Sequence, residues 1–164
     1  MIKRNIRTTI LFLTAVLMIS LVSCDLSKKL EKEENNNIQD YLSNNSNLDF
    51  VLKTSGLYYL EVVSGTGASP VENDSAFVKY TGMFLDGTVF DSNVSLSTLY
   101  GFKVGESIPG FDEGIKLMKQ GGKSMFLIPS KLAYGADGKY PYIDGYTPLL
   151  FDIELVKVVP AAAK

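Results

Sequence analysis

The sequence lacks several side chains on which common enzyme chemistry depends. It has no histidine and no tryptophan, one cysteine, Cys24, and two arginines, Arg4 and Arg7. Without histidine, a Ser-His-Asp or Cys-His nucleophile, a histidine-containing zinc site and an imidazole pH switch are excluded. An arginine finger is excluded from any domain that begins after Arg7. Chemistry based on carboxylates, lysine and tyrosine remains, and we expect neither a metal nor a cofactor.

Residues 1–23 have the pattern of an export signal. Met1 to Arg7 is basic, and Thr8 to Val22 is uncharged and mostly apolar. This run is shorter than the roughly 20 apolar residues of a membrane-spanning helix, so it predicts a signal peptide. The sequence LVSC that ends at Cys24 resembles the bacterial lipobox, which implies lipidation of Cys24 and a membrane anchor. The alternative is an unlipidated signal peptide followed by a free thiol.

Acidic residues outnumber basic ones. The chain has 16 Lys and Arg against 18 Asp and Glu, and removing Lys3, Arg4 and Arg7 with the signal leaves 13 against 18, or −5. Because a negative surface repels phosphates, we expect no nucleic-acid partner.

Residues 24–49 are rich in Lys, Glu, Asn and Ser and predict a lipidated polar spacer. Ile38, Tyr41 and Leu42 have the i, i+3, i+4 spacing of an amphipathic helix, so one alternative is a short helix that docks on the domain or on a partner. The other is a disordered chain, which at about 25 residues would reach roughly 25–30 Å.

Residues 50–164 predict a single α+β domain of four or five antiparallel strands and one short helix. The helix is expected from Phe111 to Lys119, because Phe111, Ile115 and Met118 then share one face and Gly121 follows its end. Alternating or β-branched and aromatic residues predict the strands. The strand segments are Leu57–Val63, Ala76–Phe84, Thr88–Phe90, a short piece around Phe102, Ser124–Ile128 and Leu149–Val158.

Short motifs between Leu57 and Val158 follow one another in a fixed order. Together, and in register with the expected strands and helix, they resemble the FKBP-type peptidyl-prolyl isomerases, although each motif alone is weak. The motifs are Val78–Gly82 (VKYTG), Asp86–Ser92 (DGTVFDS), Phe102–Gly105 (FKVG), Ile108–Gly114 (IPGFDEG), Met118–Gly122 (MKQGG), Ile128–Ser130 (IPS), Ala133–Gly135 (AYG) and Leu150–Leu155 (LFDIEL).

The resemblance implies an FKBP-like antiparallel sheet wrapped on the short helix, with a shallow pocket between them. Phe111 would form the pocket floor, Tyr134 would reach toward a substrate carbonyl, and Ile108 would offer its backbone N–H. The aromatic residues could otherwise be plain core, and Asp91 could be a turn residue or an acceptor for Tyr80. The implied catalytic residues are Tyr80, Phe90, Asp91, Ile108, Phe111, Tyr134 and Phe151, and the implied substrate-binding residues are Tyr100 and Ile143.

The implied reaction is the cis–trans isomerisation of X-Pro bonds in proline-containing polypeptides, with tacrolimus-like macrolides as further ligands. Rotating the amide moves no proton, and its barrier of about 18–20 kcal/mol comes from lost resonance, so the missing side chains are not needed. With the export signal, this implies assistance to the folding of exported proteins at the bacterial envelope, facing the periplasm or the cell surface. The alternative is an FKBP-like peptide-binding or chaperone module with little or no turnover.

Two segments depart from the family's usual pattern. Phe111 stands where the family commonly has tryptophan, and the residues Ile143 to Tyr146 (IDGY) stand where it usually has Ile-Pro-Pro. The tyrosines of this loop, Tyr140, Tyr142 and Tyr146, either add substrate contacts or are simply surface.

Overall fold

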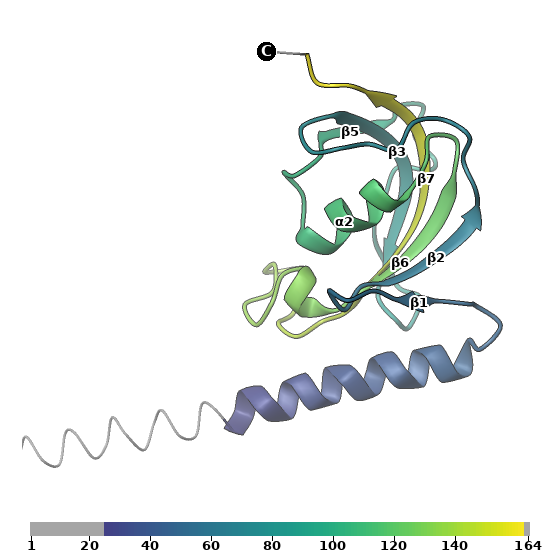
Figure 1. Cartoon of the computed structure of the whole chain (residues 1–164). Helices are drawn as coiled ribbons and strands as arrows, with labels where there is room; N and C mark the ends of the chain where they lie inside the picture. Colours follow the sequence, from purple (N-terminus) through teal and green to yellow (C-terminus); the bar gives the residue numbers. More distant parts are fainter. Residues whose placement is uncertain (1–24, 163–164) are drawn as a thin grey trace, which may run out of the picture.

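The computed structural model describes residues 25–162. The predicted signal peptide and Cys24 lie outside the described residues. The described chain starts with a helix over residues 25–44, called the N-terminal helix below, and continues into a curved sheet that holds α2 in its hollow (Figure 1). The elements are β1 (Val51–Leu52), β2 (Tyr58–Val63), β3 (Ser75–Met83), β4 (Val89–Ser92), β5 (Tyr100–Lys103), α2 (Pro109–Leu117), β6 (Lys123–Ile128), the 3₁₀ helix η1 (Ser130–Leu132) and β7 (Leu149–Val159).

The sheet is antiparallel throughout, in the order β1-β2-β6-β7-β3-β4, with β5 also paired to β3. One edge of β3 pairs with β7, and its other edge is shared between β4 at Thr81–Met83 and β5 at Ser75–Val78. The α+β class is confirmed, but the sheet has seven strands where four or five were expected. Six of the seven strands lie on the segments named from the sequence, so the expected number was too low although the segments were correct, and the seventh is β1, which has two residues.

Helix α2 begins and ends two residues earlier than the sequence predicted. Pro109 occupies the first turn, where its missing N–H is not needed, and Met118 leaves the helix with an extended backbone. The predicted buried face is nevertheless correct, because Phe111, Ile115 and Met118 are all buried. A Cβ on Gly114 would lie 2.4 Å from the Phe126 ring, so this glycine lets α2 approach β6 closely.

Helix α2 packs against the concave face of the sheet, and the N-terminal helix covers part of the opposite face. The main core lies between α2 and the concave face and includes Ile115, Phe126 and Ile153. On the other side of β6 and β7, Ile38 of the N-terminal helix packs with Leu127 and Leu150. Of the two alternatives for the polar segment, the structure therefore has the docked helix. No helix in residues 25–162 has both the length and the apolar character that are needed to cross a bilayer.

Candidate active site

A pocket of about 360 Å³ lies where α2 faces the concave side of the sheet. All nine residues that the sequence singled out for the site line this one pocket, although their individual roles stay predictions. Three further residues line it that were not assigned to the site: Ser107, Lys139 and Tyr142. The full lining is Tyr80, Phe90, Asp91, Tyr100, Ser107, Ile108, Phe111, Tyr134, Lys139, Tyr142, Ile143 and Phe151.

The floor of the pocket is a set of interlocked aromatic rings. Phe111, from the first turn of α2, is 4% exposed and meets the rings of Phe102 and Phe151 edge to face, with centroids 5.3 and 5.2 Å apart. This arrangement places the positive ring edge against the negative ring face and is favourable beyond the area it buries. Phe111 is thus both core and pocket lining, and the floor is apolar and firmly packed.

Gly82 in β3 makes room for the aromatic wall. A Cβ at this position would lie 2.7 Å from the Phe90 ring and 3.0 Å from the Phe151 ring. These two rings meet edge to face at 5.7 Å over the glycine. A residue with a side chain at position 82 would therefore push the wall into the pocket.

Tyr80 and Asp91 form a short hydrogen bond across two paired strands. The Tyr80 hydroxyl donates to Asp91 Oδ2 over 2.6 Å. Asp91 lies within β4, so of its two alternatives the structure has the hydrogen bond and not the turn. Burial, and then the hydrogen bond and negative charge of Asp91, raise the pKa of Tyr80 well above its ordinary value. The phenol therefore stays protonated at physiological pH, with its proton held by Asp91.

Buried Asn93 braces the main chain of Tyr80. Its side-chain oxygen accepts the Tyr80 N–H over 2.8 Å, and its side-chain amide donates to the Val78 carbonyl over 3.0 Å. The Asn93 N–H in turn donates to the Tyr80 carbonyl over 3.2 Å. These bonds fasten the loop that follows β4 to β3, and so fix the strand that carries Tyr80.

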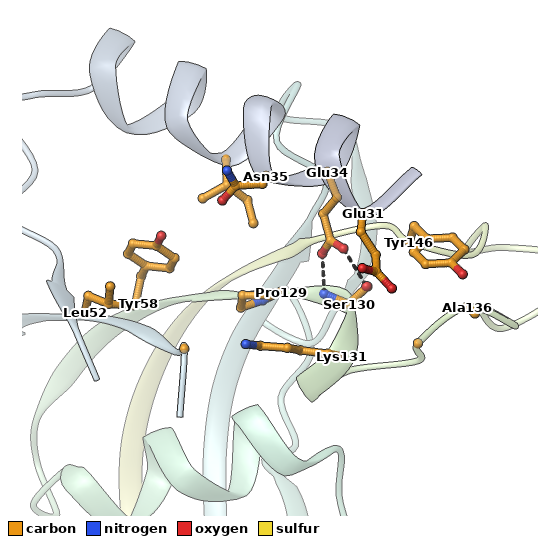
Figure 2. A pocket seen from close by; sticks show the side chains of 13 residues that line it. Glu31, Glu34, Asn35, Leu52, Tyr58, Pro129, Ser130, Lys131, Ala136 and Tyr146 are labelled. Carbon is orange, nitrogen blue, oxygen red and sulfur yellow. Dashed lines mark hydrogen bonds between the residues drawn. The ribbon is translucent and has the colours of Figure 1, made fainter. Parts of the chain in front are cut away.

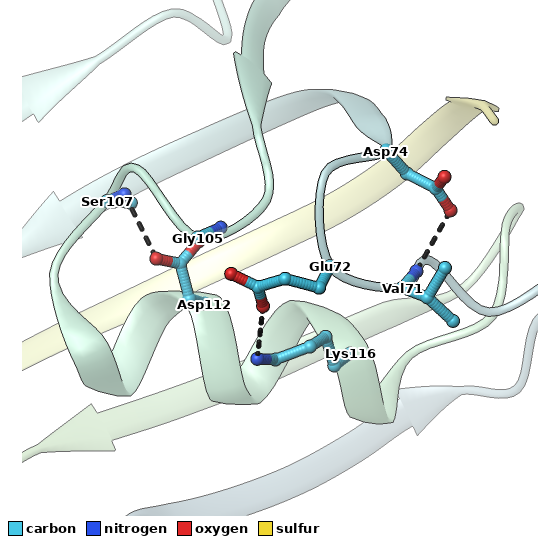
Figure 3. A network of polar contacts seen from close by, with 7 residues as sticks. All are labelled: Val71, Glu72, Asp74, Gly105, Ser107, Asp112 and Lys116. Atoms are coloured by element: carbon cyan, nitrogen blue, oxygen red, sulfur yellow. Dashed lines mark hydrogen bonds and ion pairs between the residues drawn. The ribbon is translucent and has the colours of Figure 1, made fainter. Parts of the chain in front are cut away.

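The Ile108 N–H is available to a ligand. Asp112 is buried in α2, and its two carboxylate oxygens accept the N–H groups of Gly105 and Ser107, each over 3.0 Å (Figure 3). The Ile108 carbonyl accepts from the first turn of α2, whereas no group among residues 25–162 accepts the Ile108 N–H. A donor is thus held in place at the N-terminus of a helix, where partial positive charge favours an oxygen ligand.

Tyr134 is half-buried and carries a hydroxyl proton that no described residue accepts. Lys139 Nζ lies 5.3 Å from the Tyr134 ring centroid and donates a long hydrogen bond of 3.5 Å to the hydroxyl oxygen. Lys139 therefore occupies a lone pair of the hydroxyl oxygen and leaves the hydroxyl proton without an acceptor. In contrast to Tyr80, Tyr134 can therefore donate to a ligand in the pocket.

The three tyrosines of the loop around Ile143 differ in position, and only one of them lines the pocket. Tyr142 lines the pocket and is 75% exposed, so it is placed to contact a ligand at the rim. Tyr140 is 94% exposed and does not line the pocket. Tyr146 lies on the far side of the loop, in a separate cavity under the N-terminal helix. The sequence indicates that this loop is rich in tyrosine, but it does not show which of the three tyrosines lines the pocket.

Residues 67–156 match the protein family described as FKBP-type peptidyl-prolyl cis-trans isomerase. The chain belongs to this family. The resemblance inferred from the order of the motifs is therefore confirmed, and the family match covers every residue of the pocket.

Individual relatives and solved structures agree with this assignment. The chain is 40% identical over 119 residues to the probable FKBP-type isomerase FkpA of Neisseria meningitidis, covering 72% of this chain and 44% of the relative. It is 36% identical over 140 residues to the outer membrane protein MIP of Legionella longbeachae, covering 85% and 60%. The chain thus spans about half the length of the curated relatives it matches.

Two crystal structures show the same fold. A peptidyl-prolyl cis-trans isomerase from Pseudomonas syringae superposes with a TM-score of 0.72 at 30% identity, covering 82% of this chain and 96% of that one. FkpA from Escherichia coli superposes with a TM-score of 0.70 at 32% identity, covering 91% and 71%.

Proposed function

We propose that this chain is a peptidyl-prolyl cis–trans isomerase that acts on proline-containing polypeptides. The observation that carries the proposal is a pocket lined by aromatic rings together with two residues, Ile108 and Tyr134, whose N–H and hydroxyl protons have no acceptor among the described residues. Family membership supports it, since the family is defined by this activity in its description.

The apolar wall lowers the rotation barrier by acting on the planar ground state. A planar X-Pro amide is more dipolar than a twisted one, so moving it from water to a pocket of phenylalanine rings disfavours the planar form relative to the transition state. Packing of the proline ring on Phe111 would hold the twisted geometry. A 10⁴-fold acceleration requires about 5–6 kcal/mol, because each 1.36 kcal/mol is a factor of ten.

Two donors are placed to hold the substrate carbonyls. The Ile108 N–H and the Tyr134 hydroxyl belong to residues that line the pocket, and neither proton has an acceptor among the described residues. In our proposal, the carbonyl of the residue before proline takes a hydrogen bond from this pair while the amide twists. No acid, base or nucleophile is needed, in keeping with a chain that has no histidine.

The activity can be tested in a protease-coupled assay on an Ala-Pro peptide. The whole chain, purified in a mild detergent, should accelerate isomerisation. A neutral hydrogen bond contributes about 1 kcal/mol, so Tyr134→Phe should lower kcat/KM about fivefold. Phe151→Ala, checked for folding by circular dichroism, should lower it further, because it opens the pocket wall. A wild-type rate equal to the uncatalysed rate would refute the proposal.

A second candidate function, the binding of extended or partly folded chains with little turnover, is favoured by exposed apolar residues near the pocket. Tyr140 and Tyr142 are 94% and 75% exposed. Val94 and Leu96, 59% and 55% exposed, lie in the loop that joins Asp91 to Tyr100, both of which line the pocket. Binding of an unfolded proline-containing protein without acceleration of the peptide would favour this function. Tacrolimus, added to either assay, tests whether macrolides compete for the pocket.

We also propose that the protein works at the bacterial envelope, attached through lipid on Cys24, and assists the folding of exported proteins. The sequence pattern before Cys24 supports this, as does the similarity to a protein named as an outer membrane protein. Incorporation of radiolabelled palmitate, and its loss in Cys24→Ala, tests the anchor. Labelling that is equal in both proteins would refute it.

A further inference from the structure

A buried carboxylate from the N-terminal helix is bonded to the chain segment that leads to Tyr134. Glu34 is 8% exposed and points from the helix toward η1 (Figure 2). Its two oxygens accept the Ser130 N–H over 2.5 Å and the Ser130 hydroxyl over 2.7 Å. Ser130 is itself 4% exposed, so little water competes for these groups.

Ser130 is also hydrogen-bonded to both sequence neighbours of Tyr134. Its carbonyl accepts the N–H groups of Ala133 and Gly135, each over 2.8 Å. The Gly135 carbonyl then accepts the Tyr146 N–H over 2.9 Å. A single residue therefore links the Glu34 carboxylate to the N–H groups of the residues on either side of Tyr134.

The helix that carries Glu34 is firmly placed. Ile38, one turn further along, is 3% exposed against Leu127 and Leu150, and Gln39 Nε2 donates to the Tyr58 hydroxyl over 3.2 Å. Between this helix and the loop after η1 lies a cavity of about 550 Å³, bordered by Glu34 and Tyr146. Because this flank of the loop is not filled by side chains, hydrogen bonds must do much of the work of fixing it.

We propose that Glu34 is a positioning residue that fixes the Tyr134 hydroxyl in the catalytic pocket, so that the N-terminal helix belongs to the catalytic apparatus. This inference rests on the proposed isomerase function. Removing the carboxylate would leave the Ser130 N–H and hydroxyl buried without partners, and the segment would shift to satisfy them. Tyr134, four residues along, would move with its flanking amides, and a misplaced donor stabilises the twisted amide less well.

Kinetics on the whole chain in detergent test the proposal. Glu34→Ala is compared with Glu33→Ala, which removes the neighbouring carboxylate on the exposed side of the same helix. We expect Glu34→Ala to lower kcat/KM about fivefold, the change that follows from roughly 1 kcal/mol of transition-state stabilisation, mainly through kcat. Glu33→Ala should match the wild type. Glu34→Gln, which keeps one oxygen for the Ser130 N–H, should recover part of the loss and should fold if Glu34→Ala does not.

A double variant separates positioning from a purely structural role. Once Tyr134→Phe has removed the hydroxyl, Glu34→Gln or Glu34→Ala should cost little further activity. Independent, multiplying losses would overturn the proposal, as would a Glu34→Ala protein that melts earlier but keeps the kcat/KM of Glu33→Ala.

Hydrogen exchange supplies a measurement that does not depend on catalysis. The Ala133 and Gly135 amides should exchange at least about fivefold faster in Glu34→Gln than in Glu33→Ala, because their acceptor is no longer held. Equal exchange rates would overturn the positioning role. If the wild type does not accelerate isomerisation at all, the proposed function fails, while the exchange rates still decide whether Glu34 positions the Tyr134 segment.

Discussion

Asp112 offers a sharp test of how the Ile108 donor is held. Its buried carboxylate accepts two N–H groups, from Gly105 and Ser107, in the segment just before Ile108. Asp112→Asn keeps the shape of the side chain but replaces one acceptor oxygen with an NH₂ group. One of the two N–H groups then faces a donor, and the remaining hydrogen bond loses its charge.

The expected destabilisation can be worked from these contacts. A hydrogen bond to a charged group contributes about 1.5–3 kcal/mol, and the charge near the helix N-terminus adds about 0.3–1 kcal/mol. Allowing for the neutral bond that survives, Asp112→Asn should lower the free energy of unfolding by about 2–3 kcal/mol. With a urea slope of about 1–3 kcal/mol per molar, the unfolding midpoint should fall by about 1 M.

Urea unfolding followed by circular dichroism, together with the peptide assay, measures both consequences. Glu106→Gln is a suitable control, because it changes a carboxylate in the same loop that forms only an exposed ion pair with Lys103. Asp112→Asn should also lower kcat/KM at urea-free conditions, where the variant is still folded, since the Ile108 N–H is no longer held. If the urea midpoint of Asp112→Asn lies within about 0.2 M of the midpoint of Glu106→Gln and kcat/KM is unchanged, the reasoning is refuted.

Three further predictions follow from the pocket and its support. Folding raises the pKa of Tyr80, so the stability that it contributes is complete below the ordinary value of 10.0 and is lost as the pH rises above it, where the unfolded chain releases the phenol proton first. The urea midpoint should therefore fall less between about pH 9 and pH 11 in Tyr80→Phe than in the wild type. Gly82→Ala pushes against Phe90 and Phe151 and should cost about 1–3 kcal/mol of stability and lower kcat/KM, whereas equal activity would contradict the close packing. Ile38→Ala should cost about 2–5 kcal/mol in urea unfolding, and an unchanged midpoint would show that the N-terminal helix does not dock.

The sequence was most informative where residues repeat a known order or a clear period. The face of α2 was predicted correctly from the spacing of Phe111, Ile115 and Met118, although the ends of the helix were not. The motifs contain seven of the nine predicted site residues, and the family resemblance supplied Tyr100 and Ile143 by position; the fold brings all nine to one pocket. Periodicity and motif order can be read from one sequence, because the first depends on neighbouring residues and the second on the order of segments along the chain.

Interactions between distant residues could not be predicted in this way. Strand β1 has two residues, both exposed, and exists because Val51 and Leu52 pair with β2. Glu34 lies in a charged, polar segment whose composition predicts a solvated face, yet its partner is 96 residues away. Asp112 lies in the first turn of α2, where a carboxylate complements the helix dipole, and only the structure shows its hydrogen bonds to the N–H groups of Gly105 and Ser107.

These distant partners share one property that bears on the mechanism. The described residues include six buried polar side chains, Glu34, Asp74, Asn93, Asp112, Ser124 and Ser130. Four of them brace polar groups of the pocket: Asn93 holds the Tyr80 strand, Asp112 the loop before Ile108, and Glu34 with Ser130 the segment before Tyr134.

Buried polar groups are costly unless they are satisfied, so this concentration around one pocket needs a reason. Isomerising a prolyl bond calls for donors at fixed positions and for no reactive group. In a protein with that task, precision has to come from the side chains that hold the donors, and it is there that this chain places its buried polar residues.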